Sequence, residues 1–196
     1  FDAFDARRDE LASAGIVLKK GVDPSTDLEP EYIAVSGGKA YVTLQENNAI
    51  AVLDLASRTF DGIYSAGFED YSVTPIDIDK KDDGYAAKTY PSLMGIRMPD
   101  AIAAFQAEGK TYLVTANEGD AREWGDEDLG TFYLSEDERD FGEEGVTSPT
   151  GAITGENSGL EGKVVFFKVE DFDGLDSGKD YLFGGRTFTV YEAGEA

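Results

Sequence analysis

Acidic side chains stand at the ends of several predicted strands, where carboxylates could hold a divalent cation. They lie directly before a first strand or directly after a second one. The metal candidates are Glu29, Glu31, Asp100, Glu118 and Asp120, with Glu46 in an equivalent position. If these strand ends gather on one face, the carboxylates repel one another and a cation relieves that repulsion. The same acids could instead accept hydrogen bonds from backbone amides in tight turns, and this alternative stays open.

Two residue types are absent, and their absence limits the reactions and the metal sites that the chain could support. The 196-residue chain contains no cysteine and no histidine. It therefore has no thiolate nucleophile, no imidazole base and no zinc site of the Cys or His type. Any side-chain metal ligands are oxygen atoms, which favours Ca²⁺ and, less strongly, Mg²⁺. Hydrolysis would need carboxylates with metal-activated water, which the acids permit and do not require.

Two arginines are the cations nearest to the acidic segments, Arg122 and Arg186. If the chain bound a phosphate group, their guanidinium groups would be the natural ligands for it. The alternative is that each arginine pairs with a neighbouring carboxylate.

The net charge excludes several partners. With 40 acidic and 17 basic side chains, the chain carries a formal charge of −23. This charge repels nucleic acids and anionic lipid surfaces. No apolar run approaches the roughly 18 residues of a membrane span, so no membrane insertion is expected. A phosphate-binding loop and a dinucleotide fingerprint are also missing, which argues against a nucleotide or flavin cofactor.

The elements that must position these residues are short strands that follow one N-terminal helix. Asp5 is expected to cap this helix and Gly15 to end it. Four apolar strands come next, at 32–35, 40–44, 50–53 and 60–64. A four-stranded meander of this size is typical of one β-propeller blade.

An internal repeat supports an all-β, propeller-like fold. A proline, an acid and an apolar strand occur both at 30–34 and at 99–103, and each is followed by a turn and a second strand. The third strand recurs as 49–54 and 163–168, and residues 186–191 indicate the start of another unit. We therefore expect one propeller segment over residues 1–196, with blade-like units at about 29–67 and 97–184 and a third from about 185.

Two insertions interrupt the repeat, at about 68–95 and 122–162. The second is strongly acidic, and its segment 135–138 has the form of a capping box, which predicts a short helix. Long loops in a compact β fold are usually functional or disordered.

Several of these stretches resemble the choice-of-anchor I family, which is related to mesenchyme-specific cell-surface glycoproteins. The similar segments are 28–36, 41–51, 98–103, 111–122 and 185–190. The resemblance implies a secreted or surface-anchored protein built on a seven-bladed propeller with long insertions. It also implies that this chain is an internal piece whose partners are other blades of the same propeller. Some members are described as alkaline-phosphatase-like or phytase-like.

The sequence thus predicts an extracellular or cell-surface binding or scaffold module, acidic and associated with Ca²⁺, without catalysis of its own. Its surface or matrix partner is not identified by the sequence. The alternative is a segment of a metal-dependent phosphomonoesterase of the alkaline phosphatase or phytase type. A third hypothesis is that the acidic insertion binds a basic partner, with an affinity that falls as salt rises.

Overall fold

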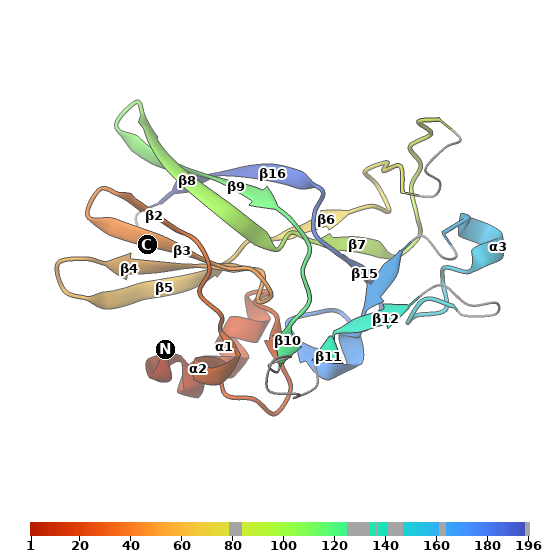
Figure 1. Ribbon diagram of the computed structural model, residues 1–196, viewed down its shortest axis with the longest axis horizontal. Coiled ribbons are helices and arrows are strands. Elements are labelled where there is room, and N and C mark those ends of the chain that lie inside the picture. The colour runs from red at the N-terminus through yellow and green to blue at the C-terminus, as the bar shows by residue number, and fades with distance from the viewer. Residues whose placement is uncertain (79–83, 125–133, 136, 141–146, 161–163, 195–196) are drawn as a thin grey trace, which may run out of the picture.

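The computed structural model describes residues 1–78, 84–124, 134–135, 137–140, 147–160 and 164–194. Two β-sheets lie one over the other on one side of the molecule, and a third extends to the other side (Figure 1). Within these residues the helices are few and short. The all-β prediction is therefore confirmed, whereas a propeller ring is not shown and stays a prediction.

The N-terminal helix begins earlier than expected. A 3-10 helix, η1 (Asp2–Arg7), leads into α1 (Arg8–Ser13). Asp5 is not its cap: its carboxylate accepts hydrogen bonds from the backbone N and the Oγ of Ser25. These bonds tie the helix to α2 (Pro24–Asp27). Gly15 ends the helical segment as predicted, with a φ of 85° that favours glycine.

The first sheet is the predicted meander. Its strands β2 (Ile33–Ser36), β3 (Lys39–Leu44), β4 (Ala49–Asp54) and β5 (Thr59–Ser65) pair antiparallel in sequence order. Local signals suffice here because the apolar runs are separated by turn-forming residues.

The second sheet differs from the expected repeat. The hairpin of β8 (Pro99–Ala107) and β9 (Lys110–Asn117) matches the first two strands of the meander. The next strand in this sheet, however, is β16 (Thr187–Ala193), which pairs with β9 along its whole length. The segment from 185 therefore does not start a separate unit. It completes the sheet that β8 began, and the unit expected at 97–184 is divided between two sheets.

The third sheet contains strands from the segments treated as insertions. Its order is β12 (Glu138–Asp140), β13 (Val165–Phe167), β15 (Asp180–Phe183), β7 (Leu93–Ile96) and β6 (Phe68–Asp70). The β15–β7 pair is parallel and the others are antiparallel. The strand expected at 163–168 therefore belongs to this sheet and not to that of β8 and β9.

Smaller elements complete the chain. Two short ladders join β1 (Leu18–Lys19) to β14 (Phe172–Asp173) and β10 (Glu123–Trp124) to β11 (Leu134–Ser135). The short helix α3 (Gly155–Ser158) precedes β13 in the chain, and the 3-10 helix η2 (Val169–Asp171) follows it. The helix predicted from the capping box at 135–138 is wrong, because β11 ends at Ser135 and β12 begins at Glu138.

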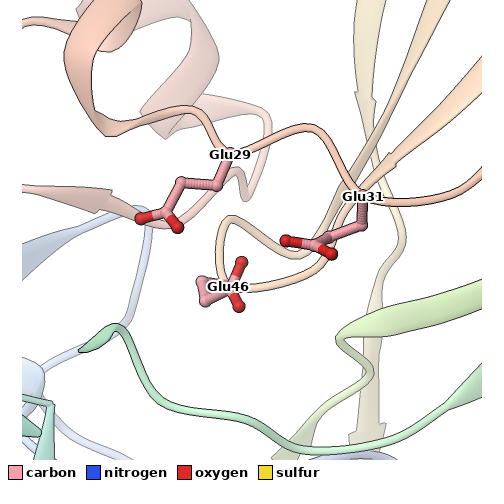
Figure 2. Close-up of side chains that lie close together, drawn as sticks. All are labelled: Glu29, Glu31 and Glu46. Carbon is pink, nitrogen blue, oxygen red and sulfur yellow. The ribbon is translucent and has the colours of Figure 1, made fainter. Parts of the chain in front are cut away.

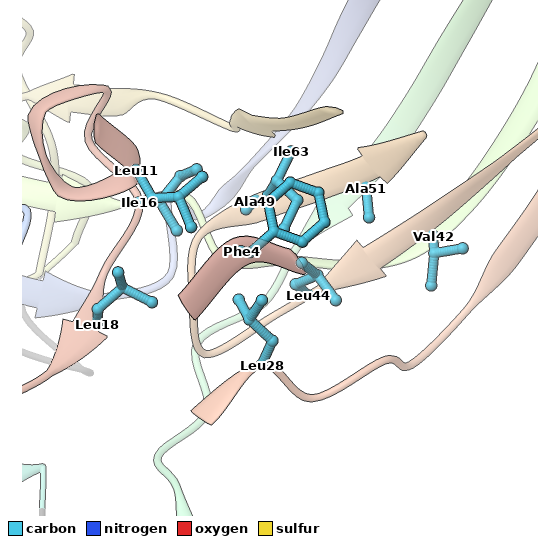
Figure 3. Packing of buried hydrophobic residues seen from close by; sticks show 10 residues of the cluster. All are labelled: Phe4, Leu11, Ile16, Leu18, Leu28, Val42, Leu44, Ala49, Ala51 and Ile63. Atoms are coloured by element: carbon cyan, nitrogen blue, oxygen red, sulfur yellow. The ribbon is translucent and has the colours of Figure 1, made fainter. Parts of the chain in front are cut away.

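The N-terminal helices cover one face of the first sheet. Phe4 and Leu11 pack on Leu44 and Ala51 in a fully apolar cluster (Figure 3). The opposite face of this sheet packs on the second sheet, where Tyr41 and neighbouring side chains of β4 meet residues of β8, β9 and β16. Burial on both faces therefore holds the turn between β3 and β4 rigidly, and this turn carries the site described next.

Candidate functional site

The turn that joins β3 to β4 is a buried junction of polar side chains. All four of its residues, Gln45, Glu46, Asn47 and Asn48, are buried. Gln45 Nε2 donates to the backbone oxygen of Glu118 at 2.8 Å. Asn48 accepts the amide of residue 98 at 3.0 Å and donates to the oxygen of residue 67 at 2.9 Å. These bonds fix the turn from three directions, so the side chain of Glu46 has little freedom.

Glu46 lies with Glu29 and Glu31 in a group of three carboxylates. One oxygen of each lies within 4.8 Å of those of the other two. Figure 2 shows Glu46 between the other two side chains, which extend from the segment between α2 and β2. Both Glu29 and Glu31 were predicted metal ligands, and Glu46 follows the second strand as the repeat indicated. The group therefore joins an acid before one strand to an acid after the next.

Glu46 is the deepest member of this carboxylate group. Its side chain is 7 % exposed, and its Oε2 has no hydrogen-bond partner among the described residues. Burial is the largest influence on this carboxyl and, with a smaller contribution from Glu29 and Glu31, raises its pKa to about 7. An unpaired carboxylate oxygen in such a place is costly unless a proton or a cation meets it.

Glu29 and Glu31 form the outer side of the group. Glu29 is half-buried, and burial raises the pKa of its carboxyl, a shift that the Arg122 guanidinium partly opposes. Glu31 is exposed. The group therefore runs from solvent at Glu31 to the interior at Glu46, which leaves a route by which an ion could enter.

A buried ion network lies beside the carboxylate group. Arg122 is fully buried, and its Nε and Nη1 lie 3.1 Å from carboxylate oxygens of Asp27 and Asp137. Its Nη2 donates to the backbone oxygen of Val17 at 3.1 Å, and its guanidinium lies 5.0 Å from the ring centre of Phe172. One guanidinium thus meets two buried carboxyl groups, one from α2 and one from the segment between β11 and β12.

Asparagine and backbone groups support the same network. Asn47 Nδ2 donates to Asp27 Oδ2 at 3.2 Å, and the amide of Lys19 donates to the same oxygen at 2.9 Å. Asp137 Oδ1 has no partner among the described residues. Because a broken buried pair leaves an unpaired charge, the network holds α2, β3–β4 and the segment after β9 in one arrangement.

The role considered for Arg122 as a phosphate ligand is therefore corrected. Its donors are engaged inside the protein, and no side of it reaches solvent. The alternative, pairing with carboxylates, is what the structure shows. Arg186 is exposed and lines a separate pocket of about 210 Å³ that also includes Asp120 and Glu138.

The remaining predicted ligands do not join the group of Glu29, Glu31 and Glu46. Asp100 is half-buried in β8, where the register with β9 shifts between residues 99 and 102. Glu118 and Asp120 are exposed after β9, and the carboxylate of Asp120 accepts the amide of Ala121 at 2.9 Å. Asp120 therefore accepts a hydrogen bond from a backbone amide, as the alternative considered for these acids predicts.

Sequence reasoning missed two residues of this region, Asp27 and Asp137. Asp27 follows a loop rich in turn formers, and Asp137 lies in the acidic insertion among many similar residues. Neither position carries a pattern that separates a buried carboxylate from a solvated one. Their pairing with Arg122 depends on contacts 95 and 15 residues apart in the chain.

The fold and the site define an acidic, mainly antiparallel β protein with a partly buried carboxylate group. The chain belongs to the choice-of-anchor I family, because the model of the choice-of-anchor I domain matches residues 1–196, the whole chain. This family suggests a domain associated with the cell surface or secreted. No curated protein and no solved structure matches the chain. Among the described residues, no helix is long and apolar enough to cross a bilayer.

Proposed function

We propose that this chain is a surface-associated binding or scaffold module that takes up Ca²⁺ at Glu29, Glu31 and Glu46, without catalysis of its own. The observation that carries the proposal is the unpartnered, buried oxygen of Glu46 inside a group of three carboxylates. Ca²⁺ takes six to eight oxygen ligands in flexible geometry, and three carboxylates with water can supply them. Mg²⁺ fits less well because it requires a stricter octahedron and gives up its water reluctantly.

The chemistry of the group supports a structural cation more than a catalytic one. A cation there would connect the segment before β2 to the turn after β3, and would offset repulsion between the carboxylates. Such an ion would therefore stiffen the β3–β4 turn against the segment that leads into β2.

The phosphomonoesterase alternative takes second place because one of its two candidate phosphate ligands, Arg122, is buried in ion pairs. The hypothesis that the acidic insertion binds a basic partner concerns a segment of which residues 125–133, 136, 141–146 and 161–162 lie outside the described part of the chain. Neither alternative gains support from the carboxylate group.

Thermal unfolding tests the cation proposal. The chain is unfolded in EDTA, with Ca²⁺ and with Mg²⁺ at matched ionic strength, next to Glu46→Gln and Glu118→Gln. A ligand at about 100 times its dissociation constant adds about 2.7 kcal/mol, which raises the Tm by several degrees at this size. We expect Ca²⁺ to raise the Tm of the natural chain and of Glu118→Gln, but not that of Glu46→Gln. The absence of a shift, or an equal shift in all three, would overturn the proposal.

A further inference from the structure

A small pocket lies where the chain passes from β15 to β16 (Figure 1). Its volume is about 210 Å³. Segments far apart in the sequence form its walls: residues 119–121, Glu138, residues 164–165, residues 182–183 and Arg186. Because some of these segments belong to the second sheet and others to the third, the pocket forms at the junction of the two sheets.

Three charged side chains line this pocket without pairing. They are the carboxylates of Asp120 and Glu138 and the guanidinium of Arg186, and all three residues are exposed. Within the described part of the chain none of them forms an ion pair, and Asp120 alone has a side-chain hydrogen bond, from the amide of Ala121 at 2.9 Å. Opposite charges that share a pocket and do not meet can both be satisfied by one ligand that carries both signs.

Backbone contacts fix the segments that carry these charges. The carbonyl oxygen of Gly185 accepts the hydroxyl of Tyr71 at 2.8 Å. The next residue, Arg186, has a φ of 50°, in the left-handed region that few residues other than glycine adopt. A Cβ at Gly119 would lie 2.3 Å from the backbone carbon of the last residue of β15, so the segment after β9 rests directly on that strand. The backbone therefore cannot shift to bring the charges together, and only the side chains can adjust.

The remaining wall of the pocket is mostly polar. Ala121, Val164 and Leu182 are buried, and the last two pack in a hydrophobic cluster beside the third sheet, so little of their apolar surface faces the pocket. Pockets for larger, apolar ligands measure about 300–1,000 Å³ and have mainly apolar walls. A volume of about 210 Å³ is the share of about seven molecules in liquid water, which suits a ligand of roughly seven to ten non-hydrogen atoms. The ligand that fits is therefore small and polar.

From these observations we propose that the pocket binds a free amino acid in its zwitterionic form. The carboxylate of the ligand accepts hydrogen bonds from the guanidinium of Arg186, whose parallel donors match a carboxylate. The ammonium group of the ligand donates to the carboxylates of Asp120 and Glu138. Because the pocket contributes two carboxylates and one guanidinium, a basic amino acid is favoured over an acidic one. This site shares no residue with the proposed cation site and requires no cation.

Calorimetric titration of the chain, after removal of divalent cations, tests the proposal. The probes are lysine, alanine and glutamate, together with alaninamide, which lacks the carboxylate of alanine, and N-acetylalanine, which lacks its ammonium group. Lysine should bind most tightly and glutamate most weakly, because the pocket holds more carboxylates than guanidinium groups. Each analogue should bind about tenfold more weakly than alanine, since it leaves one charge of the pocket without a partner.

Two variants and two matched controls locate the binding. Arg186→Gln should weaken alanine binding about tenfold, and Glu138→Gln should weaken it severalfold. Arg58→Gln and Glu108→Gln are the controls, because both residues are exposed and have a positive φ, 60° and 51°, but lie in turns outside the pocket. Both controls should bind alanine as the natural chain does.

Three results would overturn the proposal. The first is the absence of alanine binding, and the second is equal binding of alanine and either analogue. The third is an equal loss of affinity in the pocket variants and in the controls. Inorganic phosphate is the last probe: if phosphate binds in place of alanine and loses affinity in Arg186→Gln, the pocket is a simple anion site and the proposal is wrong.

Discussion

The guanidinium of Arg122 lies 3.1 Å from the carboxylate of Asp27, 95 residues earlier in the chain, and both side chains are fully buried. The contact joins the segment after β9 to the end of α2. Together with Asp137 it forms an internal ion network directly beside the carboxylates of Glu29 and Glu46. The electrostatics of the candidate cation site thus depend on a residue that cannot itself reach a ligand.

Arg122→Met should strongly destabilise the protein. The change removes the cation that pairs with both Asp27 and Asp137 and leaves two buried carboxylates without it. Loss of one partner from such a network typically costs about 3–5 kcal/mol. Arg7→Met is the control, because its ion pair with Glu10 lies on the surface, where solvent screening keeps its contribution to stability small. Urea unfolding measures both, and a loss in Arg122→Met no larger than in the control would contradict this view.

Glu46→Gln should stabilise the ion-free protein near neutral pH. In the folded state the pKa of Glu46 is about 7, against an ordinary value of 4.5. Folding therefore takes up a proton between these two values, so the contribution of this group to the free energy of unfolding falls as the pH rises from 4.5 to 7. The uncharged variant should gain on the order of 1–3 kcal/mol above pH 7 and nothing below about pH 4.

The measurement is urea unfolding in EDTA across this pH range. Glu118→Gln serves as the matched control, since Glu118 is exposed. A stability difference between Glu46→Gln and the natural chain that stays constant with pH would show that the carboxyl does not titrate differently in the folded state. With Ca²⁺ at saturating concentration, the order of stability should reverse if the proposed cation site exists.

Gly174→Ala should cost more than Gly109→Ala. Both glycines have a positive φ, 89° and 78°, so both variants pay a backbone strain of about 1 kcal/mol. A Cβ at Gly174 would additionally lie 2.1 Å from the backbone oxygen of Ile16, whereas nothing lies within 4 Å at Gly109. The β1–β14 ladder would have to open, and Tm measurements should show a markedly larger loss for Gly174→Ala. Equal losses would mean that the ladder adapts freely.

Asp180→Ala should loosen the segment that precedes α3. The buried carboxylate of Asp180 accepts the Oγ of Ser148 at 2.7 Å, and the amide and Oγ1 of Thr150 at 2.9 and 2.6 Å. Without it these donors lose their acceptor in a buried place, at a cost of about 2–4 kcal/mol. Hydrogen exchange should accelerate at residues 148–153 first. In Asp176→Ala, which alters an exposed turn, exchange in this segment should stay unchanged.

Local patterns predicted the first sheet closely, but not the pairing of the later strands. Alternating apolar residues and turn formers mark β2 to β5, because each strand pairs with its sequence neighbour. The same pattern identified the strand at β16 but placed it in a unit of its own. Its partner is β9, and Thr187 pairs with Asn117 across 70 residues. Periodicity shows that a segment is extended and does not show which edge it will join.

The candidate site, too, could be predicted from the sequence only in part. The strand-end positions of Glu29, Glu31 and Glu46 were visible in the repeat, because an acid recurred before and after corresponding strands. Asp100, Glu118 and Asp120 occupy equivalent positions but point to different surroundings. The direction of a side chain at a strand end depends on how its turn packs, and that packing involves distant parts of the chain.

Composition alone determined that any metal bound by side chains must be held by oxygen atoms and that the chain is strongly acidic, and the order of apolar and turn-forming residues predicted the all-β fold. Only the tertiary structure decided which carboxylates meet. The contacts of Gln45 and Asn48 turn Glu46 into the interior, where desolvation raises its pKa. The same packing keeps Arg122 away from solvent and places it beside Asp27. Burial and charge pairing are properties of the packed chain, since they arise from residues that the sequence places far apart.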